Sequence, residues 1–162
     1  MPATYADGGL RAYLDALPGN TGFLAIEAGV QAQGRAVVKQ TKINASAVIK
    51  EPSIFDGLID SFKLRKTTQR TRAKTPVGQA MSLFQMVAER PAGSHFHFLE
   101  FGFTARDGRF IPGKPYIEPA IEGTIQEQKH VFDKTVRKKS DQLAEKFKRG
   151  GFTQREKRYL NA

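Results

Sequence analysis

The sequence predicts an α+β protein in which a small antiparallel β-sheet of three to four strands packs against N-terminal helices and one long C-terminal helix. Three observations support this class: an alanine-rich N-terminal part with helical character, a central part in which short apolar segments alternate with turn residues, and a long C-terminal segment with helical hydrophobic spacing. The 162 residues, 40% of them hydrophobic, suffice to bury one core. We expect one domain over residues 1–150 and a basic tail over residues 151–162.

The N-terminal part is expected to form two helices. Residues 7–17 place leucines at helical spacing, and a Pro-Gly-Asn sequence follows them. Residues 21–50 predict the second helix, which a Glu-Pro pair ends because the residue before a proline avoids helical geometry. Gly29 and Gly34 interrupt this helix, so each either weakens it or marks close packing against another element.

The middle of the chain predicts three strands joined by turns, as in an antiparallel meander. In residues 58–64, Leu58, Phe62 and Leu64 share one parity, which is the pattern of a half-buried strand. The basic residues 65–75 are expected to form an exposed loop or extended hairpin. Residues 80–89 and 95–103 supply the second and third strands, and the Gly- and Pro-rich residues 106–115 form a loop.

A long helix is expected after this loop, ending before Gly150. Residues 119–149 would span about 46 Å at about 1.5 Å per residue, whereas a compact domain of this size is about 40 Å across. We therefore expect the apolar stripe of this helix to be covered by a neighbouring subunit, the alternative being that the helix bends back along the sheet. The stripe consists of Ile117, Ile121, Ile125, Phe132, Val136, Leu143 and Phe147.

The net charge of +10 is concentrated in two segments. Residues 63–74 contain six Lys or Arg and no acidic residue, and residues 129–162 contain eleven basic and four acidic residues. Such patches indicate a polyanionic partner, which is either nucleic acid or an acidic protein surface. The alternative is a solvated helix face together with a basic loop.

Motifs of catalysis and metal binding are missing. On a strand over residues 95–103, His95 and His97 would point to one side and Glu100 to the other, so they would not converge on a metal ion. His130 is the only other histidine, and the chain has no cysteine. No nucleophile motif G-x-S-x-G and no glycine-rich phosphate motif occur. We predict no catalytic residue, no metal and no cofactor, and we rank an enzyme using the histidines last.

The sequence also lacks the features of a membrane or secreted protein. Its N-terminus has neither the basic start nor the apolar run of a signal peptide, and nowhere do about 18 apolar residues follow one another. We expect synthesis in the cytoplasm and no contact with a membrane.

Three short motifs follow one another in a characteristic order. They are a Gly-Leu-x-x-Ser turn, a Glu-Phe-Gly sequence at a predicted strand end, and a Pro-aromatic-hydrophobic-x-Pro-Ala-hydrophobic-Glu box. Over residues 20–150 the chain thereby resembles the tail-completion, or head–tail joining, family of long-tailed bacteriophages. The matching residues are Gly57, Leu58, Ser61, Glu100, Phe101, Gly102, Pro115, Tyr116, Ile117, Pro119, Ala120, Ile121 and Glu122. The chain departs from the family pattern at Phe103, which precedes the expected Thr, and in its longer basic segments.

The motif residues also have physical roles that the residue types suggest. Glu100 could hold a turn by accepting backbone N–H bonds. Pro115 and Pro119 would stiffen the start of the long helix. The alternative is that these positions serve folding alone and touch no partner.

The resemblance implies a virion structural protein, made in the host bacterial cytoplasm, that forms a hexameric ring at the neck or the top of the tail. Its partners would be further copies of itself, adjacent connector, tail-tube or terminator proteins, and passing double-stranded DNA, contacted without sequence readout. The residues expected to line the lumen or face a partner are Lys63, Arg65, Lys66, Arg70, Arg72 and Lys74. Those expected to form a docking tail are Arg155, Lys157, Arg158 and Tyr159.

Two other functions stay open at this point. A tail terminator would occupy the same junction, and the sequence does not separate it from a tail-completion protein. A sequence-independent nucleic-acid-binding protein would instead bind DNA as a monomer, with strong salt dependence.

Overall fold

The computed structural model describes residues 14, 17, 21–49, 57–67, 84–154 and 156–157, except for the side chains of residues 92 and 94. Contacts between Cα atoms divide the chain into two compact units, which are residues 1–32 with 129–162 (unit 1) and residues 33–128 (unit 2). The elements in chain order are α2 (Gly22–Val48), α3 (Leu58–Ser61), β1 (Phe62–Lys66), β2 (Phe84–Ala88), η3 (Ala92–His95), α5 (Phe96–Phe101), β3 (Gly102–Thr104), β4 (Phe110–Pro112), α6 (Ile117–Gly123) and α7 (Ile125–Arg149).

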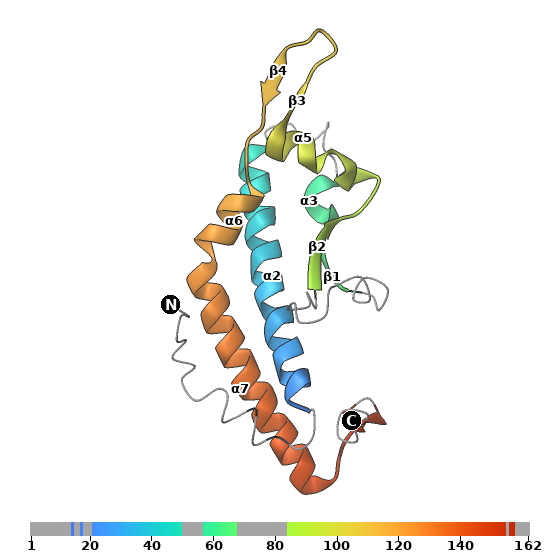
Figure 1. Ribbon diagram of the computed structural model, residues 1–162, viewed down its shortest axis with the longest axis vertical. Coiled ribbons are helices and arrows are strands. Elements are labelled where there is room, and N and C mark those ends of the chain that lie inside the picture. Colours follow the sequence, from blue (N-terminus) through green and yellow to red (C-terminus); the bar gives the residue numbers. More distant parts are fainter. Residues whose placement is uncertain are drawn as a thin grey trace, which may run out of the picture. The chain divides into compact units, whose positions relative to one another are not determined.

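The fold class is α+β, as the sequence predicts, but within the described residues the strands form two sheets of two strands each (Figure 1). In the first sheet, β1 and β2 are antiparallel, with Phe62 opposite Ala88. In the second, β3 and β4 are antiparallel, with Phe103 opposite Ile111. The expectation of one three-stranded meander is therefore wrong, because the third predicted strand is mostly a helix.

The segment predicted as a strand over residues 58–64 begins as the helical turn α3. Gly57 precedes this turn with φ 74°, a left-handed conformation that favours glycine. Leu58 and Ser61, three residues apart, are both buried, and the Ser61 hydroxyl donates to the Leu58 carbonyl at 2.6 Å. The chain becomes extended only at Phe62. The expected loop after residue 65 lies outside the described residues from position 68 onward.

Residues 96–101 form the helix α5, whereas the sequence analysis assigned them to a strand. Phe96, Leu99 and Glu100 face the interior of unit 2, at the i, i+3, i+4 spacing of a helix. His95 and His97 are exposed. The alternating aromatic residues fit both periods, so the pattern of this short segment did not distinguish strand from helix.

The expected long helix is two helices. Thr124 lies outside both, and its hydroxyl donates to the Ala120 carbonyl at 2.6 Å. The first helix, α6, contains seven residues. The second, α7, contains 25 residues and is about 37 Å long at about 1.5 Å per residue. The helix is therefore shorter than the length on which a neighbouring subunit was inferred.

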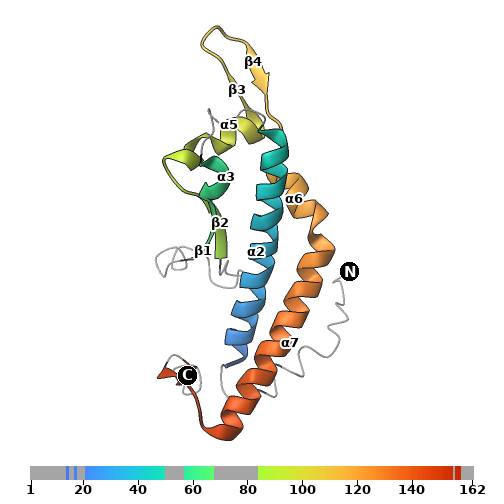
Figure 2. The same ribbon diagram turned by 180° about the vertical axis from the view of Figure 1, so that it is seen from behind.

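The core of unit 1 forms where α7 packs against the first turns of α2 (Figures 1 and 2). Leu24 and Ala25 of α2 are buried together with Val136 and Leu143 of α7. At Gly29, an added Cβ atom would lie 2.6 Å from Val136 and 2.7 Å from Phe132. The chain's own α2 thus covers the central part of the α7 stripe.

The part of α2 that belongs to unit 2 packs against the first sheet. An added Cβ atom at Gly34 would lie 2.6 Å from the side chain of Leu64 in β1. Both glycines of the helix therefore mark close packing, one of the two alternatives that the sequence left open. None of the helices in the described part of the chain is long and apolar enough to cross a membrane.

Candidate functional site at the base of the β3–β4 hairpin

The core of unit 2 joins two motifs that are far apart in the sequence. Leu58 of the Gly-Leu-x-x-Ser turn and Tyr116 of the Pro-aromatic box are both fully buried in one cluster with Phe62 and Ala45. The rings of Phe62 and Tyr116 meet edge to face, with centroids 5.8 Å apart. This geometry favours the interaction of aromatic quadrupoles beyond simple burial. The motif residues therefore share one structural centre.

The Glu100 carboxylate holds the first turn of α6. It is 5% exposed. Its oxygens accept the backbone N–H of Tyr116 at 2.9 Å, of Ile117 at 3.1 Å and of Glu118 at 3.3 Å. These N–H groups have no partner within the helix, and a negative charge near the helix N-terminus is favourable. The expectation that Glu100 holds a turn through backbone N–H bonds is confirmed.

Tyr116 connects three further elements at the same place. Its hydroxyl donates to the Phe96 carbonyl in α5 at 3.3 Å, and its own carbonyl accepts the Asn44 side-chain amide of α2 at 3.2 Å. Burial, and to a lesser degree the negative charge of Glu100, raises the pKa of the Tyr116 hydroxyl above its ordinary value of 10. The phenol therefore stays protonated and acts as a donor.

Two glycines fix the base of the hairpin formed by β3 and β4. Gly102 has φ 81°, and an added Cβ atom there would lie 2.4 Å from the Ile111 carbonyl oxygen. At Gly113 the corresponding distance is 2.5 Å to both the Glu100 carbonyl oxygen and the Gly102 nitrogen. Backbone atoms cannot move aside as side-chain ends can. The Lys114 N–H also donates to the Leu99 carbonyl at 2.7 Å.

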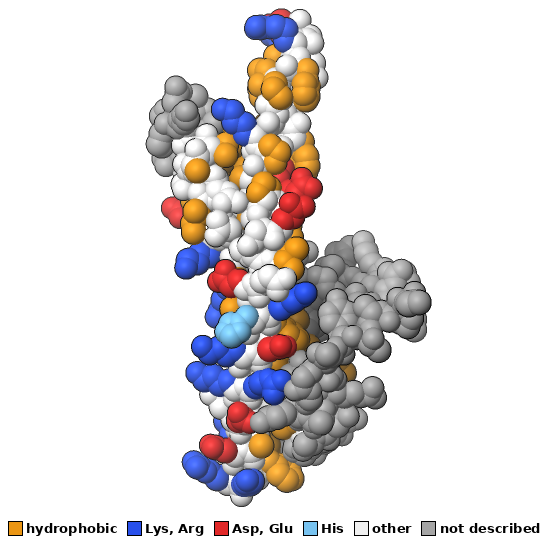
Figure 3. All heavy atoms as spheres, turned by 90° about the vertical axis from the view of Figure 1, so that its left-hand side faces the viewer, with side chains coloured by type: hydrophobic (Ala, Val, Ile, Leu, Met, Phe, Trp, Pro, Cys, Tyr) orange, Lys and Arg blue, Asp and Glu red, His pale blue; other side chains and the backbone are white. Residues whose placement is uncertain are grey.

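The hairpin exposes large hydrophobic side chains along its length and charged ones at its tip (Figure 3). Phe103 is 40% exposed and Phe110 is 64% exposed. The tip is a tight turn in which the Asp107 carboxylate accepts both the backbone N–H and the guanidinium N–H of Arg109. The exposed hydrophobic residues around the hairpin and α5 are Phe98, Phe101, Phe103, Phe110 and Ile111.

A groove lies beside α6 in the same unit. Its volume is about 480 Å³. Phe101, which is 72% exposed, Ile117 and Ile121 supply its apolar side chains. Two exposed carboxylates, Glu118 and Glu122, also line it. In Figure 3 acidic side chains gather at the level of α6. We call this surface, made by Glu100, Phe101, Ile117, Glu118, Ile121 and Glu122, the α6 groove.

The proline residues of the third motif, Pro115 and Pro119, are exposed. Ala120 is buried, and Gly57 is exposed at the start of α3. Seven motif residues therefore lie at the junction or in the α6 groove. They are Glu100, Phe101, Gly102, Tyr116, Ile117, Ile121 and Glu122.

The expected basic patch is only half within the described residues. Lys63 and Arg65, on one face of β1, both bond to the Glu89 carboxylate, the lysine at 2.5 Å. Their hydrogen bonds hold the pKa of Glu89 below its ordinary value of 4.5. Lys66 is exposed at the end of β1. The remaining residues of the patch, Arg70, Arg72 and Lys74, lie outside the described part. Glu89 thus neutralises part of the charge on which the prediction rested.

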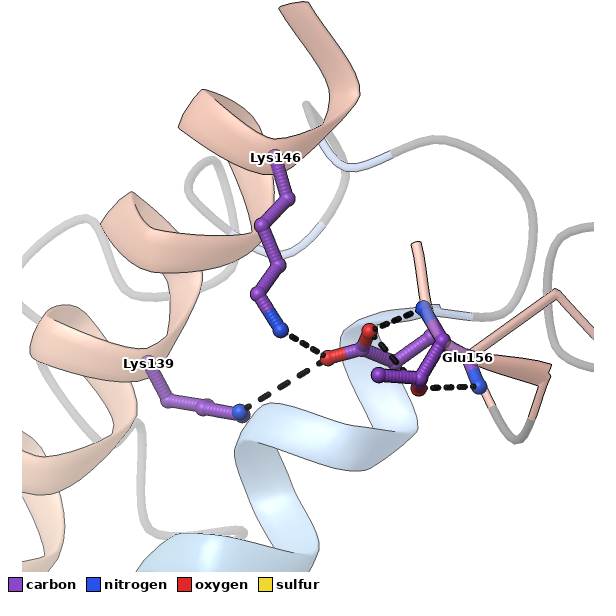
Figure 4. Close-up of polar contacts among 4 residues, drawn as sticks. Lys139, Lys146 and Glu156 are labelled. Carbon is purple, nitrogen blue, oxygen red and sulfur yellow. Dashed lines mark hydrogen bonds and ion pairs between the residues drawn. The ribbon is translucent and has the colours of Figure 1, made fainter. Parts of the chain in front are cut away.

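The C-terminal segment is attached to α7 in unit 1 (Figure 4). The Glu156 carboxylate accepts a hydrogen bond from Lys146 at 2.8 Å and others from the backbone and side chain of Thr153, and Lys139 lies 4.0 Å away. Burial alone would raise the pKa of Glu156, but these bonds outweigh it and lower the pKa to about 2. Of the predicted docking tail, Lys157 is exposed, whereas Arg155, Arg158 and Tyr159 lie outside the described residues.

The three histidines lie on the surface, and the ring of His97 contacts Phe98 of α5 with centroids 4.1 Å apart. His95, His97 and His130 are all exposed. Among the described residues, no three His, Asp or Glu side chains lie close enough to hold a metal ion.

Sequence reasoning missed the second strand of the hairpin and its exposed aromatic residue Phe110. The signal was present, because Asp107-Gly108 lies between Phe103 and Phe110 with an arginine on each side, and Asp-Gly is a preferred turn of β-hairpins. The Gly- and Pro-rich composition of residues 106–115 led instead to a loop. Asn44 gave no sequence signal of its contact with Tyr116, because 72 residues separate them.

No family model, no curated protein and no solved structure matches this chain.

Proposed function

We propose that this chain is a structural protein of a bacteriophage particle, where it takes part in head–tail joining or tail completion as a ring at the neck or the top of the tail. The observation that carries the proposal is the convergence of the motif residues. Glu100, Gly102 and Tyr116, which belong to two separate motifs, form one junction that holds a projecting hairpin.

Such a junction suits an architectural role. Backbone-to-backbone contacts at Gly102 and buried hydrogen bonds at Glu100 hold the hairpin at a defined angle to α6. The hairpin itself carries exposed aromatic side chains and basic residues, which can contact another protein. A rigid base with an exposed apolar arm is an arrangement for docking, and the described residues of the junction offer no nucleophile or acid–base pair.

Contact with passing DNA remains part of the proposal. Lysines of α7 supply the exposed positive charge, including Lys129, Lys134 and Lys138. They are better placed for this role than Lys63 and Arg65, which Glu89 neutralises in part. Attraction of this kind acts on phosphates and carries no sequence information.

A tail terminator at the same junction is the closest alternative, because a ring-forming protein with a docking hairpin would serve either station. Electron microscopy of particles assembled without this chain distinguishes a joining protein from a tail terminator. Loss of joining should leave filled heads beside finished tails of uniform length, whereas loss of a terminator should leave tails of variable length. Supplying the chain from a plasmid should restore complete particles. Normal numbers of infectious particles without the chain would contradict both stations.

A monomeric nucleic-acid-binding protein is the alternative from another class. It predicts DNA binding by the purified chain that weakens steeply with salt, with a log–log slope close to the number of phosphates contacted. Strong binding by a monomer, together with absence of the chain from purified particles, would replace the structural proposal with this one.

A further inference from the structure

We propose that the hairpin arm, residues 102–112, of one copy of this chain docks into the α6 groove of a second copy, so that copies associate head to tail. This inference rests on the proposed function, because it identifies the contact through which copies would form a ring. Both surfaces belong to unit 2.

The hairpin arm leaves much of its apolar surface exposed, although Phe103 packs edge to face on Phe98 of α5 with ring centroids 5.5 Å apart. Each strand has three residues, and an isolated two-stranded hairpin offers no second layer against which to pack. Phe110 is 64% exposed and Ile111 is 43% exposed as a result. Clustered exposed aromatic residues of this kind mark protein–protein contacts, whereas single exposed residues do not.

The arm is also prevented from folding back onto its own chain. Gly102 and Gly113 bring backbone atoms into contact at its base, and the Lys114 N–H bonds to Leu99. In Figure 1 the hairpin projects from α5 and away from α6. The α6 groove is therefore not the docking place of its own arm but is open to the arm of another copy.

Charge favours this pairing of surfaces. Arg106 and Arg109 outnumber Asp107 at the tip of the arm, and Lys114 follows its second strand. The groove presents Glu118 and Glu122, which have no ion-pair partner among the described residues, as is also true of Arg106. Opposite charges around an apolar centre fix the register of a contact and speed its formation. Two like surfaces, arm on arm or groove on groove, would place like charges together.

The sizes of the two surfaces are compatible. The groove is an open surface depression, and its volume of about 480 Å³ leaves room for an aromatic side chain. A buried aromatic side chain contributes about 150–250 Å². Phe103 and Phe110, which are 40% and 64% exposed, would bury about 160–260 Å² of one copy, and Phe101, which is 72% exposed, about 110–180 Å² of the other. The neighbouring backbone and polar side chains must supply the rest of the roughly 800 Å² per partner that a specific interface buries.

The contact is between two different surfaces, so it leaves each bound copy with one free arm or one free groove. Repetition closes into a ring if the rotation between copies closes, and continues as a filament otherwise. This topology provides a test that does not depend on the number of copies.

Two variants of the full chain test the arm and the groove one at a time. The arm variant carries Phe110→Ser and Arg106→Glu, and the groove variant carries Ile121→Ser and Glu122→Lys. A charge control carries Glu127→Lys, an exposed position of α7 outside the groove. Circular dichroism and thermal unfolding establish that all three fold as the wild type does, and sedimentation velocity measures their association.

We expect the wild type and the charge control to form oligomers at micromolar concentration. Each surface variant alone should associate at least about tenfold more weakly. An equimolar mixture of the two should form a one-to-one dimer that does not grow, because only one intact arm meets one intact groove. Oligomers of wild-type size from the groove variant alone, a mixture that stays monomeric, or a wild type that is monomeric throughout would each overturn the inference.

The proposed function is judged by a separate measurement, the copy number of the chain in purified particles. Particles that contain the groove variant at the wild-type copy number would overturn the docking inference and leave the proposed function standing. Particles that lack the wild-type chain would overturn the proposed function itself.

Discussion

The two units of this protein bury their hydrophobic side chains to different degrees. In unit 1, α7 and the start of α2 enclose Val136 and Leu143 completely, and Gly29 allows the helices to approach closely. In unit 2, a core around Tyr116 is equally well buried, yet the hairpin and α6 leave Phe101, Phe110 and other large hydrophobic residues exposed.

The difference indicates where each unit has completed its packing. A pair of helices covers the central part of the α7 stripe and completes the described core of unit 1, whereas Phe23 and Phe147 stay 61% and 54% exposed. A two-stranded hairpin cannot complete a core in this way, and its exposed apolar side chains are available to another molecule. The expectation that a neighbouring subunit covers the long helix stays a prediction, because Ile121, Ile125 and Phe147 of its stripe are 45%, 45% and 54% exposed.

The largest expected effect tests whether the core of unit 2 depends on the tyrosine at the junction. Tyr116→Ala should lower the free energy of unfolding by about 3–5 kcal/mol, because it removes a fully buried ring and leaves a cavity. Tyr116→Phe, which loses only the bond to Phe96, should cost about 1 kcal/mol. Urea unfolding followed by circular dichroism measures both. Equal losses from the two substitutions would show that the hydroxyl, not the ring, stabilises the junction.

The next comparison sets a glycine of unit 2 against one of unit 1. Gly102→Ala should cost about 2–4 kcal/mol, because it combines a positive φ with a collision against a backbone carbonyl. Gly29→Ala should cost less, about 1–2 kcal/mol, since Phe132 and Val136 can shift and alanine favours the helix. Gly123→Ala, with open space around it, serves as the control. A smaller loss at Gly102 than at Gly29 would contradict the rigid base of the hairpin.

Removal of the buried carboxylate charge should have an intermediate effect. Glu100→Gln should cost about 1.5–3 kcal/mol, because a charged acceptor of several backbone N–H bonds is replaced by a neutral amide. The matched control is Glu122→Gln, whose exposed carboxylate accepts no bond within the described chain and should change stability by less than about 0.5 kcal/mol. Similar values for the two variants would show that Glu100 does not hold the start of α6.

The stability of unit 1 should depend on pH through the ionisation of the Glu156 carboxyl. Its pKa in the folded chain, about 2, lies below the ordinary 4.5, so its stabilising contribution is fully present above about pH 4.5 and is lost as the pH falls toward about 2. The expected loss is about 1–2 kcal/mol, because Lys146 stays 38% exposed and solvent weakens the ion pair. Unfolding of wild type and Glu156→Gln at pH 6 and pH 2.5 measures it. The two proteins should differ in stability at pH 6 and converge at pH 2.5, and a constant difference would contradict this assignment.

The smallest effect on stability is expected at the tip of the hairpin. Phe110→Ser should change the free energy of unfolding by less than about 0.5 kcal/mol, because the side chain is 64% exposed. Phe132→Ser, within the core of unit 1, should cost about 3 kcal/mol or more. Thermal unfolding of the two variants checks the contrast. A large loss from Phe110→Ser would mean that this side chain already packs within its own copy.

Composition and flanking turn residues predicted two of the elements. The helix α2 lies where the alanine-rich segment places it, and the strand β2 lies within a short segment of ambiguous period between turn residues. The role of Glu100 could also be predicted from its residue type, because a carboxylate beside a glycine readily accepts backbone N–H bonds. In contrast, the segment from His95 to Phe101 contains too few turns for its period to separate helix from strand.

By itself the sequence determined the α+β class and the long N-terminal helix. Only the tertiary structure decided that the glycines of this helix mark close packing, that α2 covers the central part of the α7 stripe, that Thr124 separates α6 from α7, and that the hairpin remains exposed. The physical reason is how far apart in the sequence the contacting residues lie. Local spacing determines which side of an element is apolar, but the neighbour that covers that side depends on contacts between residues far apart in the chain, such as Gly29 with Phe132 or Asn44 with Tyr116.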